Sequence, residues 1–368
     1  MMPTILLTGA TGFVGSALAA TLLARGMGVV AVSRRDPHGN RTRAAVRAAA
    51  RGCGITLDEA MPQLRIVDAG EGGAADALKD GAADDIAAVW HCAADMGHSG
   101  LRIAQSFDTN VCETTALYRW AARQAPRCQR FYHVSTAYTA GMRGGHTEER
   151  LHAGERLLNA YQISKWSAEH ALRTKHDIYG LPVTLFRPTI VVGHSRSGWT
   201  PRNRSGFYMF VEAVEAVRLA GLKRIAYDLP DDVCIDLLPL DWLVDDAAAL
   251  TLRSEARGNF EVFHCAGGRS MTSRAMLSMM GELLDVQIDF APMAQAADFR
   301  FARAVAANHP FEITDWDFCR ARLDGVLGTS ASREPVSPAQ LRALLHWYID
   351  AGKADIQADA MPRTGTAR

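Results

Sequence analysis

The sequence predicts an α/β fold built on a doubly wound parallel sheet. Short apolar segments favour strands at 4–7, 28–32, 64–67, 87–92, 130–135 and 182–187, and helix-forming stretches separate them. Strands that alternate with helices are typical of a parallel sheet covered by helices on both faces. A glycine-rich turn after the first strand and a tyrosine-lysine pair further along indicate where its chemistry lies.

The first strand leads directly into a glycine turn and a helix. The apolar run Thr4-Ile-Leu-Leu7 precedes Thr8-Gly-Ala-Thr-Gly-Phe-Val-Gly15, and a helix-forming stretch begins at Ser16. The three glycines at 9, 12 and 15 allow a sharp turn, close approach to a pyrophosphate and tight packing of the helix on the strand. A turn without a ligand also needs glycines, but the strand and helix on either side favour dinucleotide binding.

The second strand ends in Ser33-Arg34-Arg35, where NAD-binding proteins usually carry an acid that holds the ribose diol. Two guanidinium groups and a hydroxyl suit a 2′-phosphate instead, so the segment favours NADP(H). Asp36 leaves an alternative open, because its carboxylate can pair with an arginine or reach the diol. Residues 36–62 are expected to form a helix whose arginines face solvent.

Tyr161 and Lys165 are one helical turn apart, so their side chains share a helix face and the ammonium can favour the ionised phenol. Ser135 and Thr136 precede them in the chain. A tyrosine packed under a solvated lysine is the alternative for this spacing alone. Together with the glycine turn, the pattern predicts a hydride-transfer site.

Composition restricts the function classes. The 368 residues include 40 basic and 40 acidic side chains, which gives no electrostatic basis for nucleic-acid binding. No signal sequence and no apolar stretch of about 18 residues is evident, so we expect a cytoplasmic protein without a membrane span. The seven cysteines and twelve histidines show no metal-binding spacing, and the odd cysteine count fits reduced thiols.

The domain organisation is expected to be discontinuous. Residues 1–194 and about 231–266 would form the dinucleotide-binding domain of Rossmann type, with strands near 233–238 and 260–265 rejoining the main sheet. Residues 195–230 and 267–350 would form a smaller C-terminal substrate cap. Residues 194–207 are expected to be a long loop over the site, and 353–368 a disordered tail.

These motifs resemble the extended short-chain dehydrogenase/reductase superfamily, from Thr4 to about Ala266. The resemblance implies a proton relay supported by Asn110 and a substrate-facing hydroxyl at Thr136 rather than Ser135. It departs at Glu113, where the superfamily usually has glycine. The implied cofactor contacts are Gly9, Thr11, Gly12, Phe13, Val14 and Gly15 in the turn, Ser33, Arg34 and Arg35 at the ribose, Asp68 and Ala69 at the adenine, and Ala93 and Ala94 beside the adenine ribose.

Within the superfamily the chain is most similar to the thioester reductase and fatty acyl reductase group, also called the male-sterility group. Three phrases carry this likeness: Tyr161-Gln-Ile-Ser-Lys-Trp-Ser-Ala-Glu169, Phe186-Arg-Pro-Thr-Ile-Val-Val-Gly193 and Leu238-Pro-Leu-Asp-Trp-Leu-Val-Asp245. The second implies nicotinamide contacts at Pro188, Thr189, Ile190 and Val191. Epimerases and keto-reductases carry versions of all three phrases.

The resemblance implies an NADPH-dependent reduction of an acyl thioester, linked to a carrier protein or to coenzyme A, to an aldehyde or an alcohol. Thr136 and Tyr161 would bind the carbonyl oxygen and Tyr161 would donate the proton. Lys165 would lower the pKa of the phenol and hold the nicotinamide ribose, while Asn110 would position a water. Alternatives are a keto-reductase or hydroxy-dehydrogenase, a nucleotide-sugar epimerase, and a nonenzymatic NADP-binding sensor.

The residues that could bind the acyl substrate have two interpretations each. Phe207-Tyr-Met-Phe210, Val211, Val214 and Val217 form either an acyl channel or plain core. Arg202 and Arg204 would meet coenzyme A phosphates or simply face solvent.

Superfamily members commonly form homodimers through the helix of Tyr161 and the helix after Asn110. Possible contacts are Trp120, Trp166, Ala168, Ala171 and Leu172, which otherwise pack internally.

Overall fold

The computed structural model describes residues 3–78, 84–201, 206–253, 258–328 and 333–360. Its centre is a seven-stranded parallel sheet in the order β11-β7-β5-β4-β1-β2-β3. The strands are β1 (Thr4–Thr8), β2 (Gly28–Ser33), β3 (Leu64–Asp68), β4 (Ile86–His91), β5 (Arg130–Val134), β7 (Val183–Pro188) and β11 (Phe260–Cys265). The predicted fold class is confirmed, and each of the six predicted strands lies within one residue of its expected ends.

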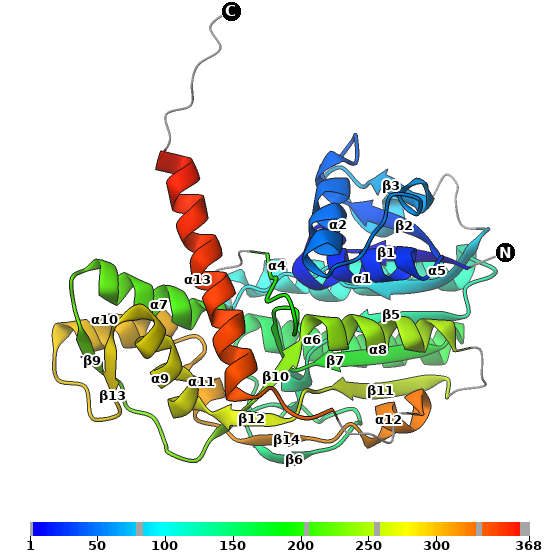
Figure 1. Ribbon diagram of the computed structural model, residues 1–368. Helices are drawn as coiled ribbons and strands as arrows, with labels where there is room; N and C mark the ends of the chain where they lie inside the picture. Colours follow the sequence, from blue (N-terminus) through cyan, green and yellow to red (C-terminus); the bar gives the residue numbers. More distant parts are fainter. Residues whose placement is uncertain (1–2, 79–83, 202–205, 254–257, 329–332, 361–368) are drawn as a thin grey trace, which may run out of the picture.

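Helices cover both faces of this sheet (Figure 1). Along β1, Ile5 and Leu7 pack into one core while Leu6 packs into another, as expected from the alternation of side chains in a strand. The first core also contains residues of α1 (Phe13–Ala24) and α8 (Leu240–Leu252), and the second contains residues of α5 (Glu113–Gln124) and α6 (Ala160–Tyr179). The chain order reverses beside β1, where ligands of such sheets bind at the carboxyl ends of the strands.

A second group of elements lies to one side of the main sheet (Figure 1). It contains α7, α9, α10, β9 and β13, and its own core is formed largely by their apolar side chains. The bounds of these and the remaining elements are β6 (Gly145–Thr147), β8 (Ile190–Val192), β9 (Arg224–Ala226), β10 (Cys234–Pro239), β12 (Arg269–Thr272), β13 (Gln287–Asp289), β14 (Trp316–Phe318), α2 (Asn40–Gly52), α3 (Ala74–Ala77), α4 (Ile103–Phe107), α7 (Tyr208–Leu219), α9 (Ser273–Leu284), α10 (Ala296–Val305), α11 (His309–Glu312), α12 (Ala321–Leu327) and α13 (Pro338–Ala360).

One of the two strands expected to rejoin the main sheet does not do so. The segment 260–265 is β11 and pairs with β7, as predicted. The segment 233–238 is β10, which pairs with β8 and β12 in a separate three-stranded sheet. The difference arises at Thr189, whose hydroxyl donates to Asp236 (Oγ1 to Oδ1, 2.6 Å) and holds β10 beside the chain that has just left β7.

Two helix predictions also need correction. The helix expected over 36–62 is α2, which begins only at Asn40 because the Asp36 carboxylate accepts the amides of Arg41 (3.1 Å) and Thr42 (2.9 Å). The tail expected to be disordered from residue 353 is helical in α13 as far as Ala360, and 361–368 lie outside the described residues. None of the described helices is long and apolar enough to cross a membrane.

The side chains expected to anchor a homodimer are engaged within one chain. Trp120 is only 4% exposed, and Ala168 and Leu172 are fully buried. Trp166 donates from Nε1 to the carbonyl oxygen of His152 (2.8 Å) and packs against the ring of His170. Trp120, Ala168 and Leu172 therefore pack internally, whereas Trp166 and Ala171 are only partly buried, and the homodimer stays a prediction.

A buried ion pair joins α6 to the main sheet. Arg187, on β7, makes a two-pronged contact with Glu169, on α6 (Nε to Oε1 2.8 Å and Nη2 to Oε2 2.6 Å), and neither side chain is exposed. Arg187 also donates to the carbonyl oxygen of Arg150 (2.8 Å). Two charges removed from water need such complete pairing, because either one alone would be strongly destabilising.

Glu169→Ala is expected to lower the free energy of unfolding by roughly 3–5 kcal/mol, since it leaves the Arg187 guanidinium buried without a counter-charge. Asp177→Ala is the matched control, because it breaks an i,i+4 pair with Arg173 on the same helix in which both side chains are about half exposed. We expect that control to cost less than about 1 kcal/mol. Urea unfolding measures both, and similar losses in the two variants would contradict this role of the pair.

Candidate active site

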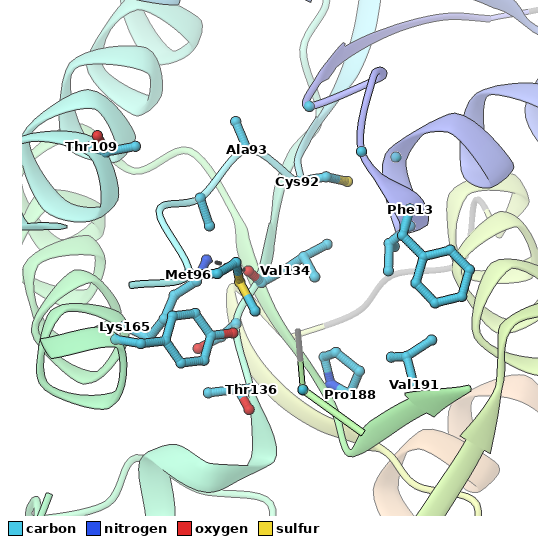
Figure 2. Close-up of a pocket in the computed structure, with 18 of the residues that line it drawn as sticks. Phe13, Cys92, Ala93, Met96, Thr109, Val134, Thr136, Lys165, Pro188 and Val191 are labelled. Atoms are coloured by element: carbon cyan, nitrogen blue, oxygen red, sulfur yellow. Dashed lines mark hydrogen bonds between the residues drawn. The ribbon is translucent and has the colours of Figure 1, made fainter. Parts of the chain in front are cut away.

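A cavity of about 790 Å³ lies between the carboxyl edge of the main sheet and the second group of elements. Its lining joins the glycine turn, the Thr136-Tyr161-Lys165 group and residues of α7, α9 and α11. Figure 2 shows Lys165 and Thr109 on helices at one side of this opening, with Phe13 and Val191 on the other side. The cavity therefore runs from the predicted cofactor turn to the second core.

The glycine turn has the properties that the sequence predicted. Gly9 has φ +78°, and a side chain there would place Cβ 2.7 Å from the amide nitrogen of Ala93. A Cβ at Gly15 would lie 2.2 Å from the carbonyl oxygen of Gly9, so α1 packs on the turn only because this residue is glycine. No side chain caps the N-terminus of α1, which begins after Gly12. Its first amides thus suit an anionic ligand such as a pyrophosphate.

The arginines after β2 take different directions. Arg34 lines the cavity, whereas Arg35 points to Glu71 and makes a two-pronged ion pair with it (2.5 Å for each contact). Arg41, one of the arginines expected to face solvent, is exposed and also lines the cavity. Its Nη1 donates to the carbonyl oxygens of Arg34 (3.2 Å) and Arg35 (3.3 Å), which holds its guanidinium beside Arg34.

The carboxylates of Asp36 and Asp68 accept hydrogen bonds from backbone amides. Asp36 is 4% exposed, and its carboxylate accepts the amides at the start of α2 and the Thr42 hydroxyl, so it is turned away from a ribose diol. The Ser33 hydroxyl lines the cavity but bonds to Thr42 Oγ1 (2.7 Å). Asp68 Oδ1 accepts the amides of Asp36 (2.9 Å) and Gly70 (3.0 Å), and Asp68 is absent from the described cavity lining, whereas Ala69, Ala93 and Ala94 belong to it.

Thr136, Tyr161 and Lys165 come together at the end of β5. The side chain of Asn159 accepts the amide of Gln162 (2.8 Å) and starts α6, which places Tyr161 and Lys165 on one face. Lys165 is 1% exposed and donates from Nζ to the carbonyl oxygen of Val134 (2.7 Å), the contact dashed in Figure 2. Thr136 follows the same strand, and its hydroxyl lies close enough to the Tyr161 phenol to affect the pKa of that phenol.

Burial controls the protonation of this group. It raises the pKa of Tyr161 above its ordinary value, although the hydrogen bond with Thr136 lowers it in part. The expected role of Lys165 in lowering the phenol pKa stays a prediction. Burial also lowers the pKa of Lys165 to about 8. A phenol that keeps its proton at neutral pH is suited to donate it to an oxygen that gains negative charge.

Asn110 supports the site without lining the cavity. It lies in a π-helical turn (Asp108–Cys112), a feature that often marks functional regions of helices. Its Oδ1 accepts the amide of Asp95 (2.7 Å), and its Nδ2 donates to the Asp95 carbonyl oxygen (2.9 Å) and to Ser164 Oγ (2.8 Å). The side chain thus ties the loop after β4 to α6, and its expected role in holding a water remains a prediction.

The cavity lining includes both expected residues and residues that no motif indicated. Pro188, Thr189, Ile190 and Val191 line it as expected. Met96, His98 and Thr109 line it from the segment that follows β4, and the ring of His98 lies 6.2 Å from that of Tyr161. Phe311 and Glu312 line it from α11. These residues belong to no motif, so only the folded chain brings them to the site.

The predicted acyl channel is partly supported. Phe207, Tyr208, Met209 and Phe210 line the cavity. Val211, Val214 and Val217 instead pack into the second core, and they are absent from the described lining. Arg202 and Arg204 lie outside the described residues. The first turn of α7 therefore supplies an apolar wall and the rest of that helix is core.

The curated proteins with similar sequences are much longer than this chain. A carboxylic acid reductase from Mycobacterium marinum is 28% identical over 293 residues, which is 71% of this chain and 24% of that protein. The fungal polyketide synthase–peptide synthetase hybrids that also match are covered over only 4% to 5% of their length. This chain thus corresponds to a minor part of those relatives.

Solved structures share the fold. The terminal R domain of the myxalamid pathway superposes with a TM-score of 0.74 at 22% identity, over 96% of this chain and 92% of that one. An archaeal thiolation-reductase di-domain gives 0.70 at 16% identity, over 96% and 91%. A UDP-glucuronic acid 4-epimerase from Bacillus cereus, with NAD bound, gives 0.64 at 18%, over 95% and 99%. The model of the male sterility proteins matches residues 7–247, and the chain therefore belongs to that family, the thioester reductase group of the extended short-chain dehydrogenases/reductases.

Proposed function

We propose that this protein is an NADPH-dependent reductase that transfers a hydride to the carbonyl carbon of an acyl thioester. One observation carries the proposal: a single cavity is lined by a glycine turn suited to a pyrophosphate, by Thr136, Tyr161 and Lys165, and by an apolar wall from α7. Membership of the family supports oxidoreductase activity with a nicotinamide cofactor.

The cofactor preference is inferred from charge. Arg34 and Arg41 line the cavity near the end of β2, and both guanidinium groups suit a 2′-phosphate. Asp36, the nearest candidate to hold a ribose diol, is committed to the start of α2. Two cations near the end of β2, with the Asp36 carboxylate engaged at the start of α2, favour NADPH over NADH.

The protein's own groups would act on the carbonyl oxygen. When bound, the reduced nicotinamide supplies the hydride. Thr136 and Tyr161 hold the oxygen by hydrogen bonds, and the Tyr161 phenol gives it a proton as charge develops. Lys165, buried beside them, stabilises negative charge on the phenolate that remains. The resulting hemithioacetal expels its thiol and leaves an aldehyde, which a second reduction converts to an alcohol.

The thioester is inferred from the relatives and from the shape of the site. Similar proteins include a carboxylic acid reductase and a thiolation-reductase di-domain. The apolar wall formed by Phe207, Met209 and Phe210 suits the hydrocarbon part of an acyl group. We therefore infer that the acyl group arrives as a thioester of a carrier protein or of coenzyme A.

Absorbance at the NADPH band tests the proposal directly. The purified chain is incubated with NADPH and with separate panels of acyl thioesters, ketones and sugar nucleotides, and NADH replaces NADPH in parallel. Thioester-dependent oxidation of NADPH supports the reductase. Turnover of ketones alone would favour a keto-reductase. Chromatography of the sugar nucleotides, incubated with the oxidised cofactors, would reveal an epimerase by conversion without net redox change. Cofactor binding by fluorescence titration without any turnover would indicate a sensor.

Tyr161→Phe removes the phenolic proton donor and keeps the ring. We expect kcat to fall by at least roughly a hundredfold, as is typical when a general acid is lost. The affinity for NADPH, followed by fluorescence titration, should stay within about twofold of wild type because the phosphate and adenosine contacts are untouched. Activity within a few-fold of wild type in a folded variant would mean that another group delivers the proton.

Arg34→Ala should weaken NADPH binding by roughly ten- to a hundredfold and leave NADH nearly unchanged, because a charge-assisted phosphate contact is lost. Arg35→Ala is the matched control at the next position, since that guanidinium is paired with Glu71 outside the described cavity lining. Equilibrium titration with both cofactors measures the effect. Equal weakening of NADPH and NADH by Arg34→Ala would contradict the phosphate assignment.

A further inference from the structure

Glu312 is an acidic side chain of the cavity wall that has no part in the proposed reduction. Glu312 closes α11, is 3% exposed and lines the cavity together with Asn308 and Phe311. Its backbone carbonyl oxygen accepts a hydrogen bond from Ser273 Oγ (3.0 Å), which fixes α11 against α9. The carboxyl group is thus held at a defined place on the wall.

Only half of this carboxyl group has a hydrogen-bond partner. The hydroxyl of Tyr227 lies 3.0 Å from Glu312 Oε2 and 2.7 Å from His309 Nδ1, and its single hydrogen can serve one of them at a time. The other oxygen, Oε1, is buried and has no partner among the described residues. Among the described residues, the ion-pair contact of Glu312 is that of its Oε2 with His309 Nδ1 (4.0 Å), which carries charge only when the imidazole is protonated, and Oε1 takes no part in it.

The apolar surroundings of Glu312 make its unpaired oxygen destabilising. Phe207, Phe210, Ile235 and Met276 line the same cavity and offer no hydrogen bond from their side chains. A buried polar oxygen without a partner destabilises a protein, so such groups usually have a role or a ligand. Burial also raises the pKa of Glu312 to about 8, which reflects the missing compensation for its negative charge.

We propose that Glu312 receives an N–H or O–H group carried by the acyl chain of the substrate, through its unpaired oxygen Oε1. The substrate class is then an acyl thioester with an amine or a hydroxyl group on its chain, rather than a plain fatty acyl group. This inference rests on the proposed function, because it places the acyl chain in the part of the cavity lined by α7 and α11. The apolar residues hold the hydrocarbon and Glu312 selects the polar group.

Binding of unreactive analogues tests the inference without catalysis. The probes are acyl-pantetheine amides of a series of chain lengths, each made with a methyl, a hydroxyl or an amino group on the chain. Calorimetry measures their affinity for the wild-type protein with NADP⁺ bound and for E312L and E312Q. E312L removes the acceptor, and the Tyr227 hydroxyl can still donate to His309. E312Q keeps an uncharged acceptor of the same shape.

At the best chain length, a donor-bearing probe should lose roughly tenfold or more in affinity, relative to the methyl probe, on going from wild type to E312L. E312Q separates the two donors: it should retain binding of the hydroxyl probe and weaken that of the amino probe, which needs the charge. Glu282→Leu is the control, because Glu282 is an exposed acid on α9 that pairs with Arg342. It should change none of the probe affinities.

Two results would overturn the inference: equal affinities for the three probes in wild type at every length, or differences that E312L leaves unchanged. Thermal unfolding checks that each variant is folded. If E312L does not fold, the affinities of wild type and E312Q for the amino probe test the inference instead. Turnover of the matching thioesters is measured separately. A protein that prefers donor-bearing probes but reduces no thioester contradicts the proposed function alone, and one that reduces thioesters without this preference contradicts only the role of Glu312.

Discussion

The geometry of the site depends on the buried ion pair between Glu169 and Arg187. Glu169 lies two helical turns after Tyr161 and one after Lys165, so the charge that holds α6 in place shares their helix face. Arg187 directly precedes Pro188, where β7 ends and the cavity lining continues. Because both charges are fully buried, neither side chain can move without losing its partner. The proton donor and the opposite wall of the cavity are therefore fixed to each other.

Two structural units contribute to the single cavity. The main sheet supplies the glycine turn, the arginines after β2 and the proton donor, all at the carboxyl ends of its strands. The second group of elements supplies apolar walls from α7 and α9 and the carboxyl group of Glu312. The first set is suited to a nucleotide and a carbonyl, which many reductases share. The second set is where substrate selection would arise.

Local sequence patterns were sufficient to predict the main sheet and much of the part of the cavity suited to the cofactor. The strands and the glycine turn are determined by short-range rules of alternation and backbone freedom, and the structure confirms them at Gly9 and Gly15. These patterns failed where a contact with a residue distant in the sequence determines the structure. Arg35 turns to Glu71, and the hydrogen bond of Thr189 with Asp236 holds β10 outside the main sheet. Arg41 is exposed as expected, but its place in the cavity lining was not predicted. Glu312 belongs to no motif, and only tertiary packing brings it to the wall.

The central claim is that a hydride passes from NADPH to the carbonyl carbon of an acyl thioester in this cavity. NADPH carrying deuterium at the transferred position of the nicotinamide C4, used with an acyl thioester that the enzyme accepts, tests it by mass spectrometry of the product. The account predicts deuterium on the former carbonyl carbon, one atom in an aldehyde and two in an alcohol, with release of the free thiol. An aldehyde or alcohol without deuterium, or thiol release by hydrolysis to the carboxylic acid, would contradict it.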